Sequence, residues 1–210
     1  MDAMTPRALT SPINPLHPAD WWRGLCFPVD NVAVCGDLDT SSDERAAGQL
    51  AEWTSAGITD IVDARGEWSD QSLVARLAPD VAYHWVGTDD LGRGQSDEWF
   101  DAGVDAAMGA LTDPARKVVV HCHMGVNRGP SMAFAIMLRL GHDPVDALQR
   151  IRGARPIAGI IYAHDALRWW HRRIDADTAH RSRDRQAVDE WFATNPSDVE
   201  WIISNIRRAS

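Results

Sequence analysis

Residues 121–129 of the sequence, His-Cys-His-Met-Gly-Val-Asn-Arg-Gly, place a thiol and a guanidinium on either side of a glycine. The continuous apolar run at 117–121 predicts a strand buried on both faces of a parallel sheet, and the apolar segment 130–140 predicts a buried helix. Cys122 would then face a helix N-terminus, where unpaired N–H groups and the helix dipole stabilise a thiolate. The same N–H groups can surround the oxygens of a phosphate, and Arg128 can add a two-pronged clamp. The segment therefore predicts a nucleophile and an oxyanion site in one loop.

The elements that must position this loop alternate between strand and helix. Strands are predicted at 31–35, 58–62, 81–86 and 117–121, and helices at about 42–55, 73–77, 97–111, 130–140, 144–152 and 160–174. Residues 87–95 form a Gly-rich acidic loop, and the polar stretch 175–184 is predicted to be a linker. Two short helices follow, with apolar stripes at Val188, Trp191, Phe192 and at Val199, Ile202, Ile203, Ile206. This pattern predicts an α/β fold with a central, mainly parallel sheet flanked by helices and a short helical C-terminal extension.

Composition excludes several classes of protein. The chain has 210 residues, of which 45% are hydrophobic and 24% charged, as in soluble globular proteins. Its longest apolar run, 132–138, is too short for a membrane span, and the first twenty residues carry no secretory signal, so we expect a cytoplasmic protein. The net charge of −9 provides no broad basic face for a nucleic acid. Three cysteines are too few for a disulfide framework, and Cys26 and Cys35 are expected to be small buried hydrophobes.

The Cys-x5-Arg pattern after a strand resembles the signature of the cysteine-based protein tyrosine phosphatases, and its surroundings resemble their dual-specificity branch. The resemblance extends over about residues 30–174 and includes a strand ending in glycine at 32–36, an Ile-Thr-x-Val-like strand at 58–62, and Arg-Pro-Ile at 155–157. It implies a dual-specificity-phosphatase-like fold for a catalytic domain at 21–174. The prolines at positions 6, 12, 15 and 18 predict an extended arm at 1–20, and the helical extension occupies 175–210.

The resemblance also implies an activity, namely hydrolysis of phosphotyrosine, phosphoserine or phosphothreonine through a cysteinyl-phosphate intermediate, with no metal or cofactor. The expected partner is a phosphorylated protein or a small phosphorylated substrate. Cys122 would be the nucleophile, with Arg128 beside it. The substrate phosphate would be bound by the residues that follow the cysteine: His123, Met124, Gly125, Val126, Asn127 and Arg128.

Members of this family also use an aspartate as general acid, roughly thirty residues before the cysteine. When residues 83–100 are aligned with the family without a gap, Asp90 falls at this position, and Asp89 is the second candidate. The resemblance further implies that His121 orients the loop through a hydrogen bond, whereas His123 either lines the pocket or faces solvent. The basic side chains Arg150, Arg152 and Arg155 are predicted to form a solvated helix face or to recruit phosphorylated substrates.

The sequence departs from the family pattern directly after Arg128. Most members of the family have Ser or Thr there, whose hydroxyl helps the sulfur to leave, but this chain has Gly129-Pro130, with Ser131 next. Slow hydrolysis of the intermediate is therefore expected unless Ser131 or a backbone group replaces that hydroxyl.

Three alternative functions stay open. The first is a phosphatase of a phosphoinositide, sugar phosphate or RNA 5′ end, the second is a catalytically weak phosphate-binding module, and the third is rhodanese-like sulfur transfer. A zinc site at 121–123 is disfavoured because strand neighbours point to opposite faces.

Overall fold

A five-stranded sheet with the strand order β1-β2-β5-β3-β4 organises the molecule. The computed structural model describes residues 21–209, so the predicted arm at 1–20 lies outside the described residues. Strands β2 (Val32–Cys35), β5 (Lys117–His121), β3 (Ile58–Arg65) and β4 (Ala82–Thr88) run parallel. Strand β1 (Cys26–Val29) pairs antiparallel with β2 at one edge. The predicted mainly parallel sheet is confirmed, and β5 lies at its centre.

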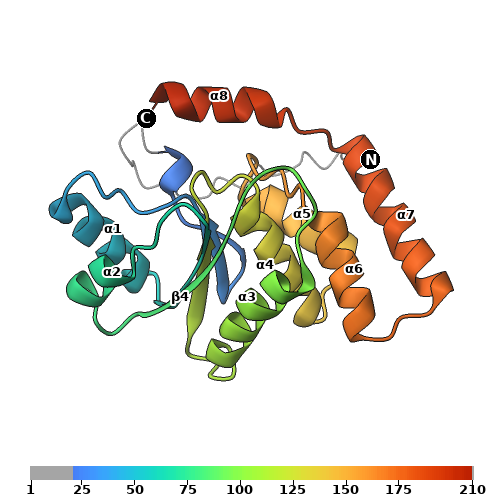
Figure 1. Ribbon diagram of the computed structural model, residues 1–210, viewed down its shortest axis with the longest axis horizontal. Coiled ribbons are helices and arrows are strands. Elements are labelled where there is room, and N and C mark those ends of the chain that lie inside the picture. Colours follow the sequence, from blue (N-terminus) through green and yellow to red (C-terminus); the bar gives the residue numbers. More distant parts are fainter. Residues whose placement is uncertain (1–20, 210) are drawn as a thin grey trace, which may run out of the picture.

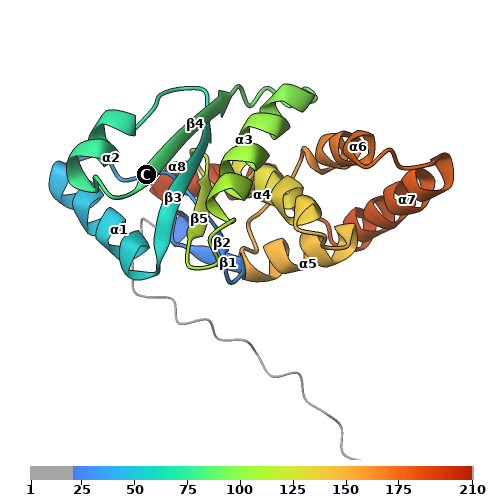
Figure 2. The ribbon, with the colours of Figure 1, turned by 90° about the horizontal axis from the view of Figure 1, so that it is seen from below.

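Helices cover both faces of the sheet (Figure 2). Helices α1 (Asp43–Ser55) and α2 (Gln71–Leu77) lie on one face. Helices α3 (Asp97–Ala110) and α4 (Arg128–Arg139) lie on the other, with α5 (Pro144–Ala154) and α6 (Ala163–Arg173) packed against α4. Alternate residues of β5 enter the two cores: Val118 and Val120 join the larger one beside α4, and Val119 joins the smaller one beside α1. This burial on both faces explains the uninterrupted apolar sequence of the strand.

Two elements differ from the sequence prediction. The predicted linker at 175–184 is wrong, because α7 (Thr178–Thr194) begins there, and the side chain of Asp177 caps it by accepting a hydrogen bond from the His180 amide. The first half of α7 is exposed and consists mostly of polar residues. It therefore shows no apolar periodicity that would predict a helix. Strand β1 was not predicted because Pro28 interrupts it; an edge strand tolerates proline since one of its sides needs no ladder hydrogen bond.

The last helix, α8 (Val199–Ala209), crosses one end of the molecule (Figure 1). Its buried Ile202 and Ile206 form a small apolar cluster with Trp22 and Val126, and Met124 packs against this cluster. The C-terminal helix is thus built directly onto the loop that follows β5. Within residues 21–209, no helix is both long and apolar enough to span a membrane.

Candidate active site

Residues 122–128, hereafter the signature loop, connect the central strand β5 to α4. Gly125 occupies the left-handed region with φ of 62°, which favours glycine. A side chain at this position would also collide with its surroundings, since a Cβ atom would lie 2.4 Å from both the Arg155 guanidinium and the Cys35 carbonyl oxygen. Glycine is therefore required for the loop to curl this tightly against β2.

The carbonyl groups of the signature loop are tied to the surrounding framework. The carbonyls of His123, Gly125 and Val126 accept hydrogen bonds from the Asp37 amide (2.9 Å), Arg155 Nε (2.6 Å) and the Gly159 amide (2.7 Å). In contrast, no backbone amide of residues 123–128 donates a hydrogen bond to any group in the described part of the chain. Successive unpaired N–H groups at a helix N-terminus form an anion-binding cradle.

Arg155 fixes the geometry of this loop, a role that the sequence did not predict. The predicted solvated helix face is wrong for this residue, which is 2% exposed. Besides Gly125, its guanidinium donates to the carbonyls of Trp22 (2.5 Å) and Met124 (3.2 Å). Arg155 therefore joins the loop to the N-terminal segment, and its place in the Arg-Pro-Ile motif was the available signal.

Arg128 and Cys122 lie together at the start of α4. Cys122 is 2% exposed, which shields its thiol from bulk solvent. The Arg128 guanidinium forms a two-pronged ion pair with Glu67, over 2.6 and 2.7 Å, and also donates to the Thr88 carbonyl over 2.9 Å. Burial disfavours the charged guanidinium, but Glu67, the Cys122 sulfur and Asp90 outweigh it and raise the pKa of Arg128. In turn, the hydrogen bonds from Arg128 lower the pKa of Glu67. Glu67 was not predicted from the sequence.

The structure brings Asp90 to the signature loop and leaves Asp89 aside. Asp90 Oδ1 accepts hydrogen bonds from Asn127 Nδ2 over 2.7 Å and from the Tyr162 hydroxyl over 2.8 Å. Its Oδ2 lies 3.4 Å from Arg128 Nε, and a third of its side chain is exposed. The Asp89 carbonyl oxygen accepts a hydrogen bond from the Gln95 side chain, and within residues 21–209 its carboxylate forms no hydrogen bond or ion pair. Of the two candidates, Asp90 alone touches the loop through its carboxylate.

Gly129 packs closely against the end of β5. A Cβ atom at this position would lie 3.2 Å from the Cys122 amide nitrogen and from the His121 carbonyl carbon, tighter than ordinary van der Waals contact. The Ser131 hydroxyl makes two other contacts: its Oγ donates to Asn127 Oδ1 over 3.2 Å and accepts from the Tyr162 amide. This serine fixes α4 to the segment before α6.

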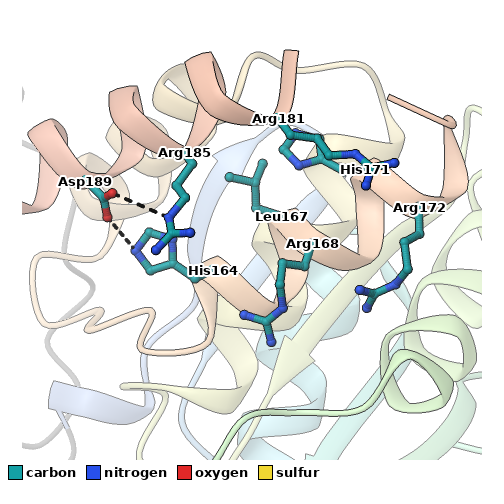
Figure 3. Close-up of a pocket in the computed structure, with 8 residues that line it drawn as sticks. All are labelled: His164, Leu167, Arg168, His171, Arg172, Arg181, Arg185 and Asp189. Carbon is teal, nitrogen blue, oxygen red and sulfur yellow. Dashed lines mark ion pairs between the residues drawn. The ribbon is translucent and has the colours of Figure 1, made fainter. Parts of the chain in front are cut away.

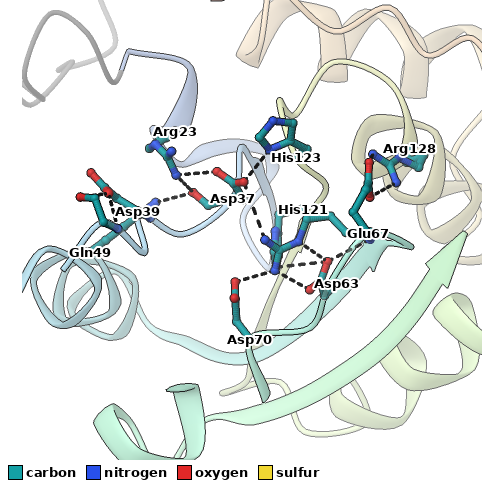
Figure 4. Close-up of polar contacts among 12 residues, drawn as sticks. Arg23, Asp37, Asp39, Gln49, Asp63, Glu67, Asp70, His121, His123 and Arg128 are labelled. Atoms are coloured by element: carbon teal, nitrogen blue, oxygen red, sulfur yellow. Dashed lines mark hydrogen bonds and ion pairs between the residues drawn. The ribbon is translucent and has the colours of Figure 1, made fainter. Parts of the chain in front are cut away.

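The two histidines that flank Cys122 have different surroundings. His121 is fully buried, and within residues 21–209 neither of its ring nitrogens has a hydrogen-bond partner, so the predicted orienting hydrogen bond is wrong. Burial lowers the pKa of His121, because the charged form of the ring would lose its hydration. His123 is partly exposed, and its Nδ1 lies 2.6 Å from Asp37 Oδ2 (Figure 4).

A buried network of charges fixes the end of β3 beside the loop. The Arg65 guanidinium pairs with Asp63 (2.6 Å) and Asp70 (2.5 Å) and lies 3.7 Å from Asp37. Glu67 follows Arg65 by two residues, so this network sets the start of the segment from which Glu67 reaches Arg128 (Figure 4). The segment that carries Glu67 therefore begins next to a buried network of ion pairs.

Comparison with known proteins identifies the fold. No family model matches the sequence. Among solved structures, human DUSP28 superimposes with a TM-score of 0.57 at 20% identity, covering 71% of this chain and 95% of DUSP28. PTPMT1 in complex with PI(5)P gives 0.56 at 15% identity, covering 71% and 95%. The human tyrosine phosphatase-like serine/threonine/tyrosine-interacting protein gives 0.56 at 15% identity, covering 72% and 99%. The chain therefore has the fold of the dual-specificity branch of the cysteine-based protein tyrosine phosphatases, as its sequence predicted.

Proposed function

We propose that the protein is a phosphatase of phosphoric monoesters that works through a cysteinyl-phosphate intermediate. One observation carries this proposal: the unpaired amides of the signature loop, the Arg128 guanidinium and the Cys122 thiol belong to one loop, and the Asp90 carboxylate contacts that loop. The amides of His123, Met124, Gly125, Val126, Asn127 and Arg128 would bind the phosphate oxygens together with Arg128. These groups supply the positive charge that the transferring phosphoryl group requires, so the proposal needs no metal ion.

The reaction would take place in two steps. The Cys122 thiolate attacks phosphorus, the bond to the ester oxygen breaks, and protonated Asp90 gives its proton to the leaving oxygen. Asp90, now ionised, then takes a proton from a water molecule, which attacks the cysteinyl-phosphate and releases inorganic phosphate and the thiolate. The hydrogen bonds from Asn127 and Tyr162 hold the Asp90 carboxylate at the loop in both steps.

For the substrate, we propose phosphotyrosine, phosphoserine or phosphothreonine in a protein. Three exposed apolar side chains support an extended partner: Trp68, Leu91 and Ile161. Trp68 and Leu91 directly follow Glu67 and Asp90, and the Ile161 amide donates to Asn127. They would give a protein substrate apolar surface next to the phosphate site. The second candidate is a phosphoinositide or another non-protein phosphate, favoured by the structural likeness to PTPMT1 in complex with PI(5)P.

A weak phosphate-binding module is the alternative that Gly129 favours, because no hydroxyl follows Arg128 to help the sulfur leave.

Turnover of p-nitrophenyl phosphate distinguishes the phosphatase from the binding module. The full-length protein is compared with Cys122→Ser and with Cys26→Ser, which is the matched loss of a thiol. We expect sustained turnover by the native protein and Cys26→Ser, and a loss of more than about 1000-fold in Cys122→Ser. Release of one equivalent that then stops supports the binding module, and turnover that survives Cys122→Ser contradicts both.

The role of Asp90 is tested with a second pair of variants. A general acid matters most when the leaving group is a poor one, so Asp90→Asn should lower kcat for phenyl phosphate by roughly 10²- to 10⁴-fold and for p-nitrophenyl phosphate much less. Asp89→Asn is the matched control and should change neither rate substantially. Equal loss on both substrates in Asp90→Asn would show that another group donates the proton.

A further inference from the structure

Far from the signature loop in the sequence, three side chains converge where α6 turns into α7. His171 lies near the end of α6, and His180 and Asp184 lie one turn apart on α7. The Nε2 atoms of the two histidines lie 2.9 and 3.1 Å from the same carboxylate oxygen, Asp184 Oδ2. The three atoms all lie within 4.8 Å of one another, and this is the only such group of His, Cys, Asp or Glu within residues 21–209.

The donor set matches the coordination chemistry of a transition metal. Imidazole nitrogen and carboxylate oxygen are ordinary zinc ligands, with bonds of about 2.0–2.2 Å, which place the ligand atoms of a tetrahedral site roughly 3.3–3.6 Å apart. The i, i+4 spacing of His180 and Asp184 places both on one face of α7. Small adjustments of the observed separations would therefore let all three atoms bind one ion.

Burial of the three side chains also suits a bound ion. The side chains of His171 and Asp184 are 6% and 13% exposed, so a ligated metal would be largely shielded from competing water. The His180 side chain is 39% exposed and leaves a path for entry from solvent. The fourth coordination position would be taken by water.

Positive charge near these three side chains would repel a metal ion. A cavity of about 350 Å³ adjoins the group, and four arginines line it: Arg168, Arg172, Arg181 and Arg185. Each guanidinium already has a partner of its own: Arg168 pairs with Asp165, Arg172 with Asp97, Arg181 donates to the Ala176 carbonyl, and Arg185 lies 3.9 Å from Asp189. Their head groups are spread around the cavity instead of meeting at one point (Figure 3). This arrangement offers no single anion site, and it weakens the repulsion that a cation at Asp184 would meet.

We propose that His171, His180 and Asp184 bind one divalent first-row transition-metal ion, zinc being the ion whose geometry and ligand preference fit best. The ion would tie α6 to α7, and so fix the helices that follow the core of the fold. The proposal is independent of the chemistry at Cys122. Its competitor is a metal-free clamp in which both histidines donate their Nε2 protons to Asp184.

The experiment uses Co²⁺, whose absorption in the visible range reports tetrahedral coordination, and Zn²⁺ in competition with it. Both are titrated into the full-length protein at pH 7.5. The Cys122→Ser background removes the most reactive candidate thiol ligand. We expect one equivalent of Co²⁺ with tetrahedral bands, displacement by Zn²⁺, and a Tm that rises with Zn²⁺ concentration.

Two partly exposed ligands provide the test variants, so that folding is preserved. Asp184→Asn and His180→Gln should each lower the affinity by more than about 100-fold, because loss of a direct ligand costs more than the 10- to 100-fold typical of outer contacts. The matched controls are Asp189→Asn and His164→Gln. They break a second His–Asp pair between α6 and α7, in which His164 Nε2 lies 3.2 Å from Asp189 Oδ1. Both controls should keep the native affinity for the metal. Absence of tetrahedral Co²⁺ bands, or bands that persist in Asp184→Asn and His180→Gln, would overturn the proposal in favour of the metal-free clamp.

Discussion

The Tyr162 hydroxyl donates a hydrogen bond to Asp90 across 2.8 Å, which connects the segment before α6 to the loop after β4. We expect Tyr162→Phe to let the Asp90 carboxylate move away from the site of proton transfer. The variant should lose roughly tenfold in kcat for phenyl phosphate, with little change for p-nitrophenyl phosphate and little change in KM. Steady-state kinetics on both substrates check this. A rise in KM with an unchanged kcat would assign Tyr162 to binding.

The pairing of Glu67 with Arg128 leads to a second prediction. Glu67→Gln keeps the size of the side chain but cannot accept two hydrogen bonds from the guanidinium as a carboxylate does. Because misplacement of a binding group by about 1 Å costs on the order of 100-fold, we expect kcat/KM to fall roughly 10- to 100-fold. Arg76 pairs with Asp43 on the exposed surface, so Asp43→Asn is a control that should leave the kinetics unchanged. Native activity in Glu67→Gln would show that Arg128 is oriented by the Thr88 carbonyl instead.

Arg155 is expected to be essential for the fold of the signature loop. Replacing it with alanine leaves buried carbonyls without donors, at about 1–3 kcal/mol for each unsatisfied group. The free energy of unfolding should fall by roughly 3–5 kcal/mol, the range for breaking a buried charged contact. Arg155→Lys should recover little of this loss, because one ammonium cannot reproduce the fork that reaches Trp22, Met124 and Gly125. Urea unfolding measures the stability of both Arg155 variants, with Arg150→Ala as the control at an exposed position. An equal loss of stability in Arg150→Ala and Arg155→Ala would contradict the structural role of Arg155.

Gly129 allows the second chemical step to be examined separately. Gly129→Ala and Gly129→Ser share the crowded Cβ atom, and we expect each to lose about 1–3 kcal/mol of stability by overpacking. Only the serine restores a hydroxyl after Arg128. The cysteinyl-phosphate should therefore decay faster in Gly129→Ser than in Gly129→Ala, as measured by quenching the reaction and determining the phosphorylated fraction by mass spectrometry. Equal decay rates would show that a hydroxyl at this position is not used.

The buried His121 predicts how stability changes with pH. Its pKa is lowered from 6.5 in the folded protein by burial, so in moderately acidic solution the unfolded chain binds a proton that the folded chain does not. The unfolding free energy should then fall as the pH drops below about 6.5. His121→Leu should remove this part of the dependence, whereas His164→Gln, at an exposed imidazole, should retain it. Urea unfolding at several pH values between about 5 and 7.5 checks the difference, and identical slopes in His121→Leu and the native protein would contradict it.

The sequence predicts those parts of the structure in which neighbouring residues share one environment. The apolar runs of β5 and α4 are buried throughout, and the turn between them follows from Cys122, Gly125 and Arg128. The Asp90 carboxylate, which the resemblance selects, contacts the signature loop at Asn127, and its role as general acid stays a prediction.

Other features depend on contacts between distant residues. Glu67 meets Arg128 from a position 61 residues away, and Arg155 reaches the Trp22 carbonyl from 133 residues away. A charged residue in an irregular or helical segment is usually solvated, so composition alone predicts no specific partner for Glu67 or Arg155. The polar start of α7 was predicted to be a linker for the same reason: its helix is stabilised by capping and by Val188 and Trp191 further along, rather than by a continuous apolar stripe.

The packing of α8 on Val126 and Met124 has a consequence for heating. Ile202 and Ile206 are the buried residues of α8, so this helix should open at a lower free energy than the central sheet. The same two residues belong to the apolar cluster that contains Val126 of the signature loop. Warming should therefore loosen the cradle of amides before the sheet itself melts, and catalytic competence should vanish at a lower temperature than secondary structure.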